Sequence, residues 1–258
     1  MKIKAIISCF SKHSENKDLF RLEKTLEHFC RHNPDIPVTV INDGGESPID
    51  IVRKFKNCYL SNEKENSYIR DGGFCRDGTF GYLWFKRLFD FGLKDDGYSH
   101  VLFLETDVLT RSRVACIPKY DMAGYGMVSW WVANEFYCDH FKMKKTKHIK
   151  YSTPWDQQEN KISFLHYGTG GTIFRKEFFK KAEQSLNIIE RLYEENKSQF
   201  LQDLAITSLA HISDCTTGEW EDVGVDEESI SWFKNREEIL RAPTGKEALI
   251  HQHEFEKE

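Results

Sequence analysis

Short apolar runs and helically spaced apolar residues follow one another along the N-terminal half of the chain. Residues 3–10 form a compact apolar run that is typical of a strand covered on both faces. From residue 19 to residue 29, apolar side chains recur every three or four positions, which predicts one buried face of a helix. Residues 38–41 predict a second strand, and the Asn-Asp-Gly-Gly sequence at residues 42–45 predicts a turn.

The same two patterns return further along the chain. Helices are predicted at residues 49–55, 80–91, 178–192 and 201–209. Strands are predicted at residues 58–60 and 101–104, and an extended segment at 248–255. Residues 62–73 predict a polar loop, and residues 122–162 show no clear period. The alternation of strands and helices predicts an α/β fold with a parallel sheet, and the lack of a repeat or linker favours a single domain.

Composition narrows the class of protein. The 258 residues are 40% hydrophobic and 30% charged, which is enough apolar material for a core. The net charge of −5 excludes a general affinity for nucleic acid, which requires a basic face. The longest uncharged stretch falls short of the ~18 residues of a transmembrane segment, and the N-terminus turns polar too soon for a signal peptide. The seven cysteines are scattered without a Cys-x-x-Cys pair, so we expect reduced thiols in a cytoplasmic protein.

The candidate chemistry begins at the end of the most hydrophobic predicted strand, residues 101–104. Glu105 and Asp107 follow this strand directly. In open α/β sheets, ligands bind beyond the carboxyl ends of the strands, so both carboxylates are expected to face that crevice. Two carboxylates separated by one residue can share a hard divalent cation, which selects oxygen ligands. A pair of surface acids that only ends the strand is the alternative interpretation.

An ordered series of motifs covers most of the chain. The motifs are VTVINDGG at residues 38–45, GFCRDG at 73–78, LFLETD at 102–107, YGTGGTIFR at 167–175, LQDLAIT at 201–207, and the late histidines His251 and His253. In this order they resemble the glycosyltransferases of the GT-A fold, especially the inverting family 2. The resemblance implies a Rossmann-like, mostly parallel sheet flanked by helices in one domain over residues 1–258. It also implies a nucleotide-sugar-binding half, residues 1–107, and an acceptor-binding half, residues 108–258.

The resemblance further implies a metal-dependent transfer of a sugar from a nucleotide-diphosphate sugar, with a UDP-sugar favoured, to a hydroxyl of a glycan or other acceptor. Asp107, with His251, His253 or both, is then expected to hold Mn²⁺ or Mg²⁺ and so to stabilise the charge of the leaving diphosphate. Residues two apart on an extended segment point to the same face, so the two histidines are expected to lie together. A polar chain end is the other interpretation of these histidines.

Three further residues are expected at the donor. By the resemblance, Glu105, which replaces the first Asp of the family's metal motif, reaches the ribose, and Asp43 hydrogen-bonds the base. Arg76 meets the base or the diphosphate, because its planar guanidinium forms paired hydrogen bonds with phosphate. Without the resemblance, Asp43 is an ordinary turn residue and Arg76 forms a surface ion pair.

On the acceptor side, Asp203 lies at the first turn of a predicted helix. It is expected to be the general base of an inverting transfer, with Asp222 as the rival base. An ordinary acid at a helix N-terminus is the alternative interpretation of Asp203. Gly170 and Gly171 are expected to let the acceptor sugar approach a strand closely.

Aromatic and basic side chains leave further alternatives open. Trp131 and Trp155 are either an acceptor platform, since sugar faces pack on aromatic rings, or part of the core. The five lysines of residues 142–150 form either a solvated face or a contact for an anionic acceptor or a membrane surface. A non-catalytic sugar-nucleotide or glycan-binding module of the same fold is one alternative function. A retaining glycosyltransferase, in which Asp203 is not a base, is another.

Overall fold

The computed structural model describes residues 2–11, 17–62, 81–129, 164–168, 170–195, 202–226 and 245–251, together with His253 and Phe255. Arg76, Trp131 and Trp155 lie outside the described residues. The lysines of residues 142–150 and all but the first residue of the expected loop at 62–73 also lie outside them. The expected roles of these residues therefore stay predictions.

Seven strands form the central sheet, in the order β10-β6-β9-β4-β1-β2-β3. Their bounds are β1 (Ile3–Ser11), β2 (Val38–Gly45), β3 (Cys58–Asn62), β4 (His100–Leu104), β6 (Met122–Gly124), β9 (Ile173–Arg175) and β10 (Thr217–Glu219). The pairs β1–β2, β1–β4, β2–β3 and β6–β10 are parallel. Strand β9 runs antiparallel to both of its neighbours, β4 and β6. The sheet is therefore mostly parallel, which confirms the predicted fold class.

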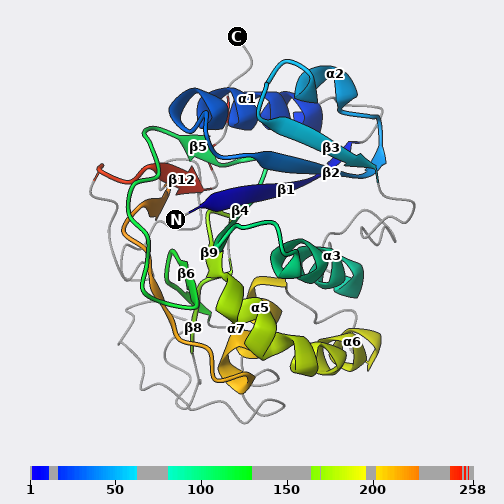
Figure 1. The fold of residues 1–258 in the computed structure, drawn as a ribbon, viewed down its shortest axis with the longest axis vertical. Helices are drawn as coiled ribbons and strands as arrows, with labels where there is room; N and C mark the ends of the chain where they lie inside the picture. The colour runs from blue at the N-terminus through cyan, green and yellow to red at the C-terminus, as the bar shows by residue number, and fades with distance from the viewer. Residues whose placement is uncertain are drawn as a thin grey trace, which may run out of the picture.

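Helices cover both faces of this sheet (Figure 1). One face carries α1 (Lys17–His32) and α2 (Ile49–Val52). The other carries α3 (Gly81–Leu93), α5 (Lys176–Ala182), α6 (Leu186–Glu195) and α7 (Gln202–Ile212), with the 3-10 turn η1 (Glu183–Ser185) joining α5 to α6. Among the helices that the structure describes, none is both long and apolar enough to cross a membrane.

The alternation of side chains along β1 explains why helices pack on both faces. Ala5 and Ile7 belong to a buried cluster that includes Leu22 of α1. Ile6, between them, belongs to a second cluster that includes Phe85 of α3. Because successive side chains of a strand point to opposite faces, one continuous apolar run supplies both cores. Burial of a side chain as large as Ile or Leu contributes about 1.5–3 kcal/mol to the free energy of unfolding. Because β1 supplies such side chains to both clusters, it stabilises the helical layers on both faces.

A three-stranded sheet at the carboxyl end of β4 brings distant parts of the chain together. Its order is β11-β12-β5, with β5 (Leu109–Thr110), β11 (Val223–Val225) and β12 (Leu249–His251). The central strand β12 is parallel to β11 and antiparallel to β5. A further pair of antiparallel strands is formed by β7 (Met127–Ser129) and β8 (Phe164–His166). The pairing of β12 with β5 fixes the late extended segment beside the residues that follow β4.

The structure differs from the sequence predictions at three places. Residues 42–45, expected as a turn, continue β2, because Asn42 pairs with both β1 and β3. The expected helix at residues 178–192 is divided into α5, η1 and α6. Strands β5 to β8, β10 and β11 were not predicted, since two or three residues are too few to show a period of two. Strand β9 falls within residues 167–175, which resemble a glycine-rich strand.

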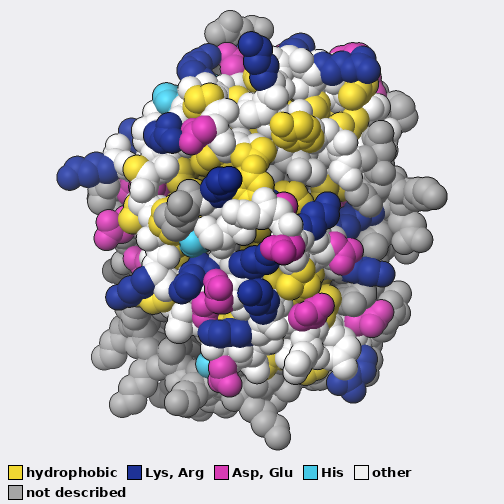
Figure 2. All heavy atoms as spheres, in the orientation of Figure 1, with side chains coloured by type: hydrophobic (Ala, Val, Ile, Leu, Met, Phe, Trp, Pro, Cys, Tyr) yellow, Lys and Arg dark blue, Asp and Glu magenta, His cyan; other side chains and the backbone are white. Residues whose placement is uncertain are grey.

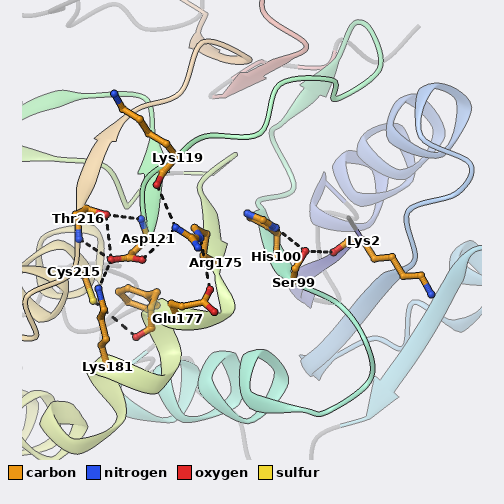
Figure 3. Close-up of polar contacts among 11 residues, drawn as sticks. Lys2, Ser99, His100, Lys119, Asp121, Arg175, Glu177, Lys181, Cys215 and Thr216 are labelled. Atoms are coloured by element: carbon orange, nitrogen blue, oxygen red, sulfur yellow. Dashed lines mark hydrogen bonds and ion pairs between the residues drawn. The ribbon is translucent and has the colours of Figure 1, made fainter.

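At the end of the sheet opposite to the carboxyl end of β4, Asp121 joins three elements (Figure 3). Its carboxylate accepts hydrogen bonds from Thr216 N at 2.9 Å and Lys181 Nζ at 2.7 Å, and Arg175 lies 4.0 Å away. Burial by itself raises the pKa of the Asp121 carboxyl, but the hydrogen bonds from Lys181 and Thr216 hold it below its usual range. This network fixes the starts of β6 and β10 against α5.

Charged side chains intermingle on the face shown in Figure 2. Dark-blue Lys and Arg side chains lie among magenta Asp and Glu side chains across its middle, and hydrophobic side chains show between them. Over the described residues of this face, the acidic and basic side chains are thus mixed, in keeping with the modest net charge of −5.

Candidate metal centre and active site

Three side chains converge beyond the carboxyl end of β4. Glu105 and Asp107 follow this strand directly, and His251 is the last residue of β12. One potential ligand atom from each lies within 4.8 Å of the other two. The convergence depends on the pairing of β12 with β5, which places the late segment against the residues after β4. Strand ends of this kind form the ligand-binding edge of open α/β sheets.

The contacts within this cluster are short. His251 Nε2 lies 2.6 Å from Glu105 Oε2 and 3.7 Å from Asp107 Oδ1. The backbone N–H of Gly170 donates to the same Glu105 oxygen at 3.0 Å. Glu105 is thus held from two sides, by a ring nitrogen and by a backbone amide. The carboxylate has a fixed position before any ligand arrives.

The electrostatics of the cluster reflect two half-buried carboxylates beside a buried imidazole. Burial by itself lowers the pKa of His251, but the charges of Asp107, Glu105 and Asp203 together raise it above its usual value. Burial raises the pKa of Asp107, and the charge of Glu105 adds to this, whereas His251 opposes it. A positive charge between the two carboxylates therefore stabilises their ionised forms. Either a proton on His251 or a bound cation can supply this charge.

The residues present fit a divalent cation. Asp107 Oδ1 is a buried side-chain atom without a hydrogen-bond partner among the described residues, and it lies 3.7 Å from His251 Nε2. Carboxylate oxygens and one imidazole nitrogen form a mixed donor set that suits Mn²⁺, and Mg²⁺ also takes carboxylate oxygens. Glu105, Asp107 and His251 are therefore the residues that could hold such an ion.

His253 has a different position from His251. Its Nδ1 lies 2.7 Å from Asp226 Oδ2, and its backbone N–H donates to the carbonyl of Asp107 at 2.9 Å. The backbone N–H of Asp226 donates to the carbonyl of His251 at 3.0 Å. The ring of Phe255 packs against that of His253, with centroids 4.9 Å apart. In this arrangement His253 anchors the late segment beside the cluster, and its imidazole contacts a carboxylate outside it.

The glycine-rich segment before β9 lies against the cluster. A Cβ at Gly170 would lie 2.8 Å from Glu105 Oε2 and 2.8 Å from His251 Cδ2. Gly171 has φ of 92°, which side chains rarely adopt, and a Cβ there would meet Val223 at 2.6 Å. The backbone of this segment therefore needs glycine in order to pack closely on the cluster. Its role toward an acceptor sugar stays a prediction.

Asp203 lies in the first turn of α7, on the far side of the same glycine segment. A Cβ at Gly168 would lie 2.6 Å from the carbonyl oxygen of Asp203, which shows how closely the segment packs on this helix. The Asp203 side chain is half-buried, and its Oδ1 accepts a hydrogen bond from Leu204 N at 3.1 Å. Its charge is near enough to His251 to raise the pKa of that histidine. The backbone at Asp203 thus packs on the glycine segment that borders the cluster.

Asp222, the rival candidate for the general base, uses its carboxylate to bind backbone N–H groups. Its carboxylate accepts backbone hydrogen bonds from Ala115 at 3.1 Å and from Cys116 at 2.8 Å. Its carbonyl accepts a hydrogen bond from Leu249 N at 2.9 Å, just where β12 begins. These bonds account for Asp222 as a residue that joins the three-stranded sheet to the segment after β5.

Asp43 lies at the carboxyl end of β2 and is completely buried. Its carboxylate forms an ion pair with Arg87 of α3, whose side chain is only 8% exposed. Sequence reasoning did not single out Arg87. The available signal was the position of Arg87 between Trp84 and Leu88 on the apolar face of the helix at residues 80–91, where a charge requires a buried partner.

Helix α1 also reaches the cluster. Thr25 Oγ1 donates a hydrogen bond of 2.9 Å to the carbonyl of Thr106, between the two acidic residues. The charge of Arg21, one turn earlier, acts to lower the pKa of Asp107. Both residues were missed in the sequence. Their spacing of four places them on one face of a helix, and this was the only signal.

The chain matches no protein-family model and no curated protein. Solved structures are similar to it over most of its length. LgtC, a galactosyltransferase in complex with donor and acceptor sugar analogues, has a TM-score of 0.54 at 11% identity, over 96% of this chain and 86% of its own. Xyloside xylosyltransferase 1 from mouse has a TM-score of 0.56 at 8% identity, over 97% of both chains. Core-mannan synthase A from Aspergillus fumigatus, in a Mn/GDP form, has a TM-score of 0.53 at 13% identity, over 85% of this chain and 73% of its own. The chain therefore has the mostly parallel, helix-flanked GT-A fold of these glycosyltransferases.

Proposed function

We propose that the protein is a metal-dependent glycosyltransferase that moves a sugar from a nucleotide-diphosphate sugar to a hydroxyl of a glycan or other acceptor. One observation carries this proposal: Glu105, Asp107 and His251 converge at the carboxyl end of β4. That edge is where open α/β sheets bind ligands, and the chain has the fold of glycosyltransferases. A UDP-sugar is the favoured donor.

In this proposal Asp107 and His251 hold the divalent cation. When bound, the cation acts as a Lewis acid that stabilises the charge growing on the leaving diphosphate. Glu105 is fixed by Gly170 N and the His251 ring, so its carboxylate is oriented before the donor arrives, and its proposed partner is the ribose. His253, bound to Asp226, supports the site by holding β12 in place.

The donor half, residues 1–107, also contains Asp43 and Arg76. We propose that both serve the nucleotide, Arg76 by pairing with the diphosphate or the base. Asp43 is completely buried and paired with Arg87, so its contact with a base requires that Arg87 move aside. With the pair intact, Asp43 instead joins the carboxyl end of β2 to α3.

The acceptor half, residues 108–258, supplies the proposed general base. Asp203 is half-buried near His251, in the first turn of α7, where the helix dipole favours the ionised carboxylate. As base it takes the proton of the acceptor hydroxyl while that oxygen attacks the anomeric carbon, which gives inversion. Gly170 and Gly171 are the proposed close-approach positions for the acceptor, and Trp131 and Trp155 its proposed platform.

A thermal-shift screen of nucleotide sugars, with and without Mn²⁺, tests the proposal. A ligand at 100 times its Kd stabilises the native state by about 2.7 kcal/mol, so the correct donor should raise the melting temperature only when Mn²⁺ is present. The same screen on Asp107→Ala is the control and should show no such shift. Binding without any transfer or donor hydrolysis would assign the chain to a non-catalytic module. If no nucleotide sugar shifts the wild-type protein, the proposal is wrong.

A further inference from the structure

Two thiols lie side by side between helix α1 and strand β3. Cys30 is in the last turn of α1, and Cys58 is the first residue of β3. Their Sγ atoms are 3.4 Å apart, and both cysteines are in the free, reduced form. Cys30 is half-buried and Cys58 is buried, so one member of the pair can be reached from solvent. This pair lies away from the candidate metal centre and has no part in the proposed transfer.

Backbone contacts next to the two cysteines hold α1 and β3 together. Asn57, directly before Cys58, donates from its side chain to the carbonyls of Ile36 at 2.7 Å and Asn33 at 3.3 Å. These bonds tie the chain just after α1 to the start of β3. A disulfide needs an S–S distance of roughly 2.05 Å, so the sulfur atoms have to approach by only about 1.4 Å.

The two thiols also differ in acidity. The hydrogen bond with Cys58 lowers the pKa of Cys30, against the effect of its own burial, and Asn57 adds to the lowering. The same hydrogen bond and burial raise the pKa of Cys58. The more accessible cysteine is thus the one that ionises first, and its buried neighbour keeps a proton to give.

The other described cysteines contrast with this pair. Burial raises the pKa of Cys9 to about 12 and that of Cys215 to about 11. Cys116 is exposed, and its pKa is also raised, by partial burial and the nearby carboxylates. Within the part of the chain that the structure describes, Cys30 and Cys58 are the two cysteines whose sulfur atoms contact each other.

We propose that Cys30 and Cys58 form a reversible dithiol–disulfide site, oxidised by a peroxide. The Cys30 thiolate attacks hydrogen peroxide, forming an S–O bond as the O–O bond breaks, and gives the sulfenic acid and hydroxide. Cys58 then attacks the Cys30 sulfur, and the disulfide forms as water leaves with the proton of the Cys58 thiol. The two thiols lose two electrons, and the peroxide gains them. A dithiol reductant reverses the step by exchange. The product is a covalent link between α1 and β3.

Peptide mapping of the full chain tests this site. The protein is treated with a small excess of hydrogen peroxide, the remaining free thiols are alkylated, and the digest is analysed by mass spectrometry. We expect a linked Cys30–Cys58 peptide, two hydrogens lighter than the separate peptides, that disappears after dithiothreitol. Recovery of both cysteines as alkylated thiols, or of Cys30 linked to another cysteine, would overturn the proposal.

Thermal melting supplies a second measurement. The oxidised wild-type protein should melt on the order of 5 °C higher than the reduced protein, because the cross-link restricts the unfolded chain. Cys116→Ser, outside the pair, should keep both the linked peptide and the shift. Cys58→Ser should lose both and accumulate sulfinic acid at Cys30, since no resolving thiol is left. An equal shift in Cys58→Ser would contradict the proposal.

Discussion

The Nε2 atom of His251 lies 2.6 Å from Oε2 of Glu105, and this contact joins β12 to the residues that follow β4. Asp107 Oδ1 is 3.7 Å from the same ring nitrogen. A cation that enters among these atoms takes the place of a proton on His251, because a metal-bound imidazole must be neutral.

Replacement of Asp107 by alanine should abolish metal-dependent nucleotide binding. The variant removes one of the two carboxylates of the cluster and its buried Oδ1. Mutation of a residue that only hydrogen-bonds a metal ligand typically costs about 10–100-fold in metal affinity. Because Asp107 is itself a proposed ligand, we expect a loss of at least about 100-fold. Calorimetry with nucleoside diphosphate and Mn²⁺ measures it. Asp90→Ala, an exposed acid of α3, is the matched control and should bind normally. Unchanged Mn²⁺-dependent affinity in Asp107→Ala would remove the proposed metal centre.

The two late histidines should respond differently to replacement. His251→Ala removes a ring in contact with Glu105 and should lose Mn²⁺-dependent binding, whereas His253→Ala should weaken it less than about tenfold. The His253 ring acts through Asp226, so Asp226→Ala should reproduce the effect of His253→Ala. Titration of each variant with Mn²⁺ in the presence of nucleotide separates the two roles. If His253→Ala loses binding completely while Asp226→Ala retains it, His253 is itself a ligand.

Asp203→Asn should lower the rate of sugar transfer and leave donor binding almost unchanged. The amide keeps the shape of the side chain but cannot accept the proton of the acceptor hydroxyl. A positioned general base contributes ~10²–10⁴-fold to rate, so kcat should fall by that amount while donor affinity changes little. Proton NMR of the first-formed product of the wild-type enzyme should show inversion at the anomeric carbon. Retention, or near-normal turnover of the variant, would indicate a retaining enzyme or another base.

Gly170→Ala should damage the cluster without unfolding the protein. The new Cβ would lie 2.8 Å from both Glu105 Oε2 and His251 Cδ2, so one of these side chains must shift. A strain of ~1.4 kcal/mol corresponds to tenfold in affinity, and we expect Mn²⁺-dependent nucleotide binding to weaken by at least that factor. Gly97→Ala is the control: its φ of 79° makes alanine strained, but nothing lies within 4 Å of the new Cβ. It should lower stability and leave binding intact. Normal binding by Gly170→Ala would show that the packing at this glycine is not needed.

His100 should make stability depend on pH in mildly acidic solution. It is buried at the start of β4 beside Ser99 (Figure 3), and burial lowers its pKa below the ordinary value of 6.5. Between pH 6.5 and the lower native pKa, the unfolded chain therefore binds more protons than the native protein. The free energy of unfolding should fall as pH decreases through this window, by up to about 1.4 kcal/mol per unit of pKa difference. Urea unfolding over a pH series should show a shallower fall for His100→Gln. Parallel curves for the two proteins would contradict the prediction.

The long elements were evident from the sequence because their periods extend over enough residues. The apolar run of β1 and the helical spacing of α1 were recognised, and the structure places both elements within a few residues of the prediction. The acidic pair Glu105 and Asp107 could also be found, since it follows the most hydrophobic strand directly. These features depend on neighbours in sequence, and local sterics and burial decide them.

Contacts between distant segments could not be read in the same way. The spacing of two between His251 and His253 predicts a shared face only while the chain remains a strand, and β12 ends at His251. Which histidine meets Glu105, and which meets Asp226, was decided by the pairing of β12 with β5 and β11. The ion pair of Asp43 with Arg87 and the Cys30–Cys58 contact likewise join separate elements. The sequence by itself determined the long elements and the kinds of chemistry they carry. Only tertiary packing decided which side chains meet, because such contacts depend on how the burial of all the apolar faces sets the register between elements.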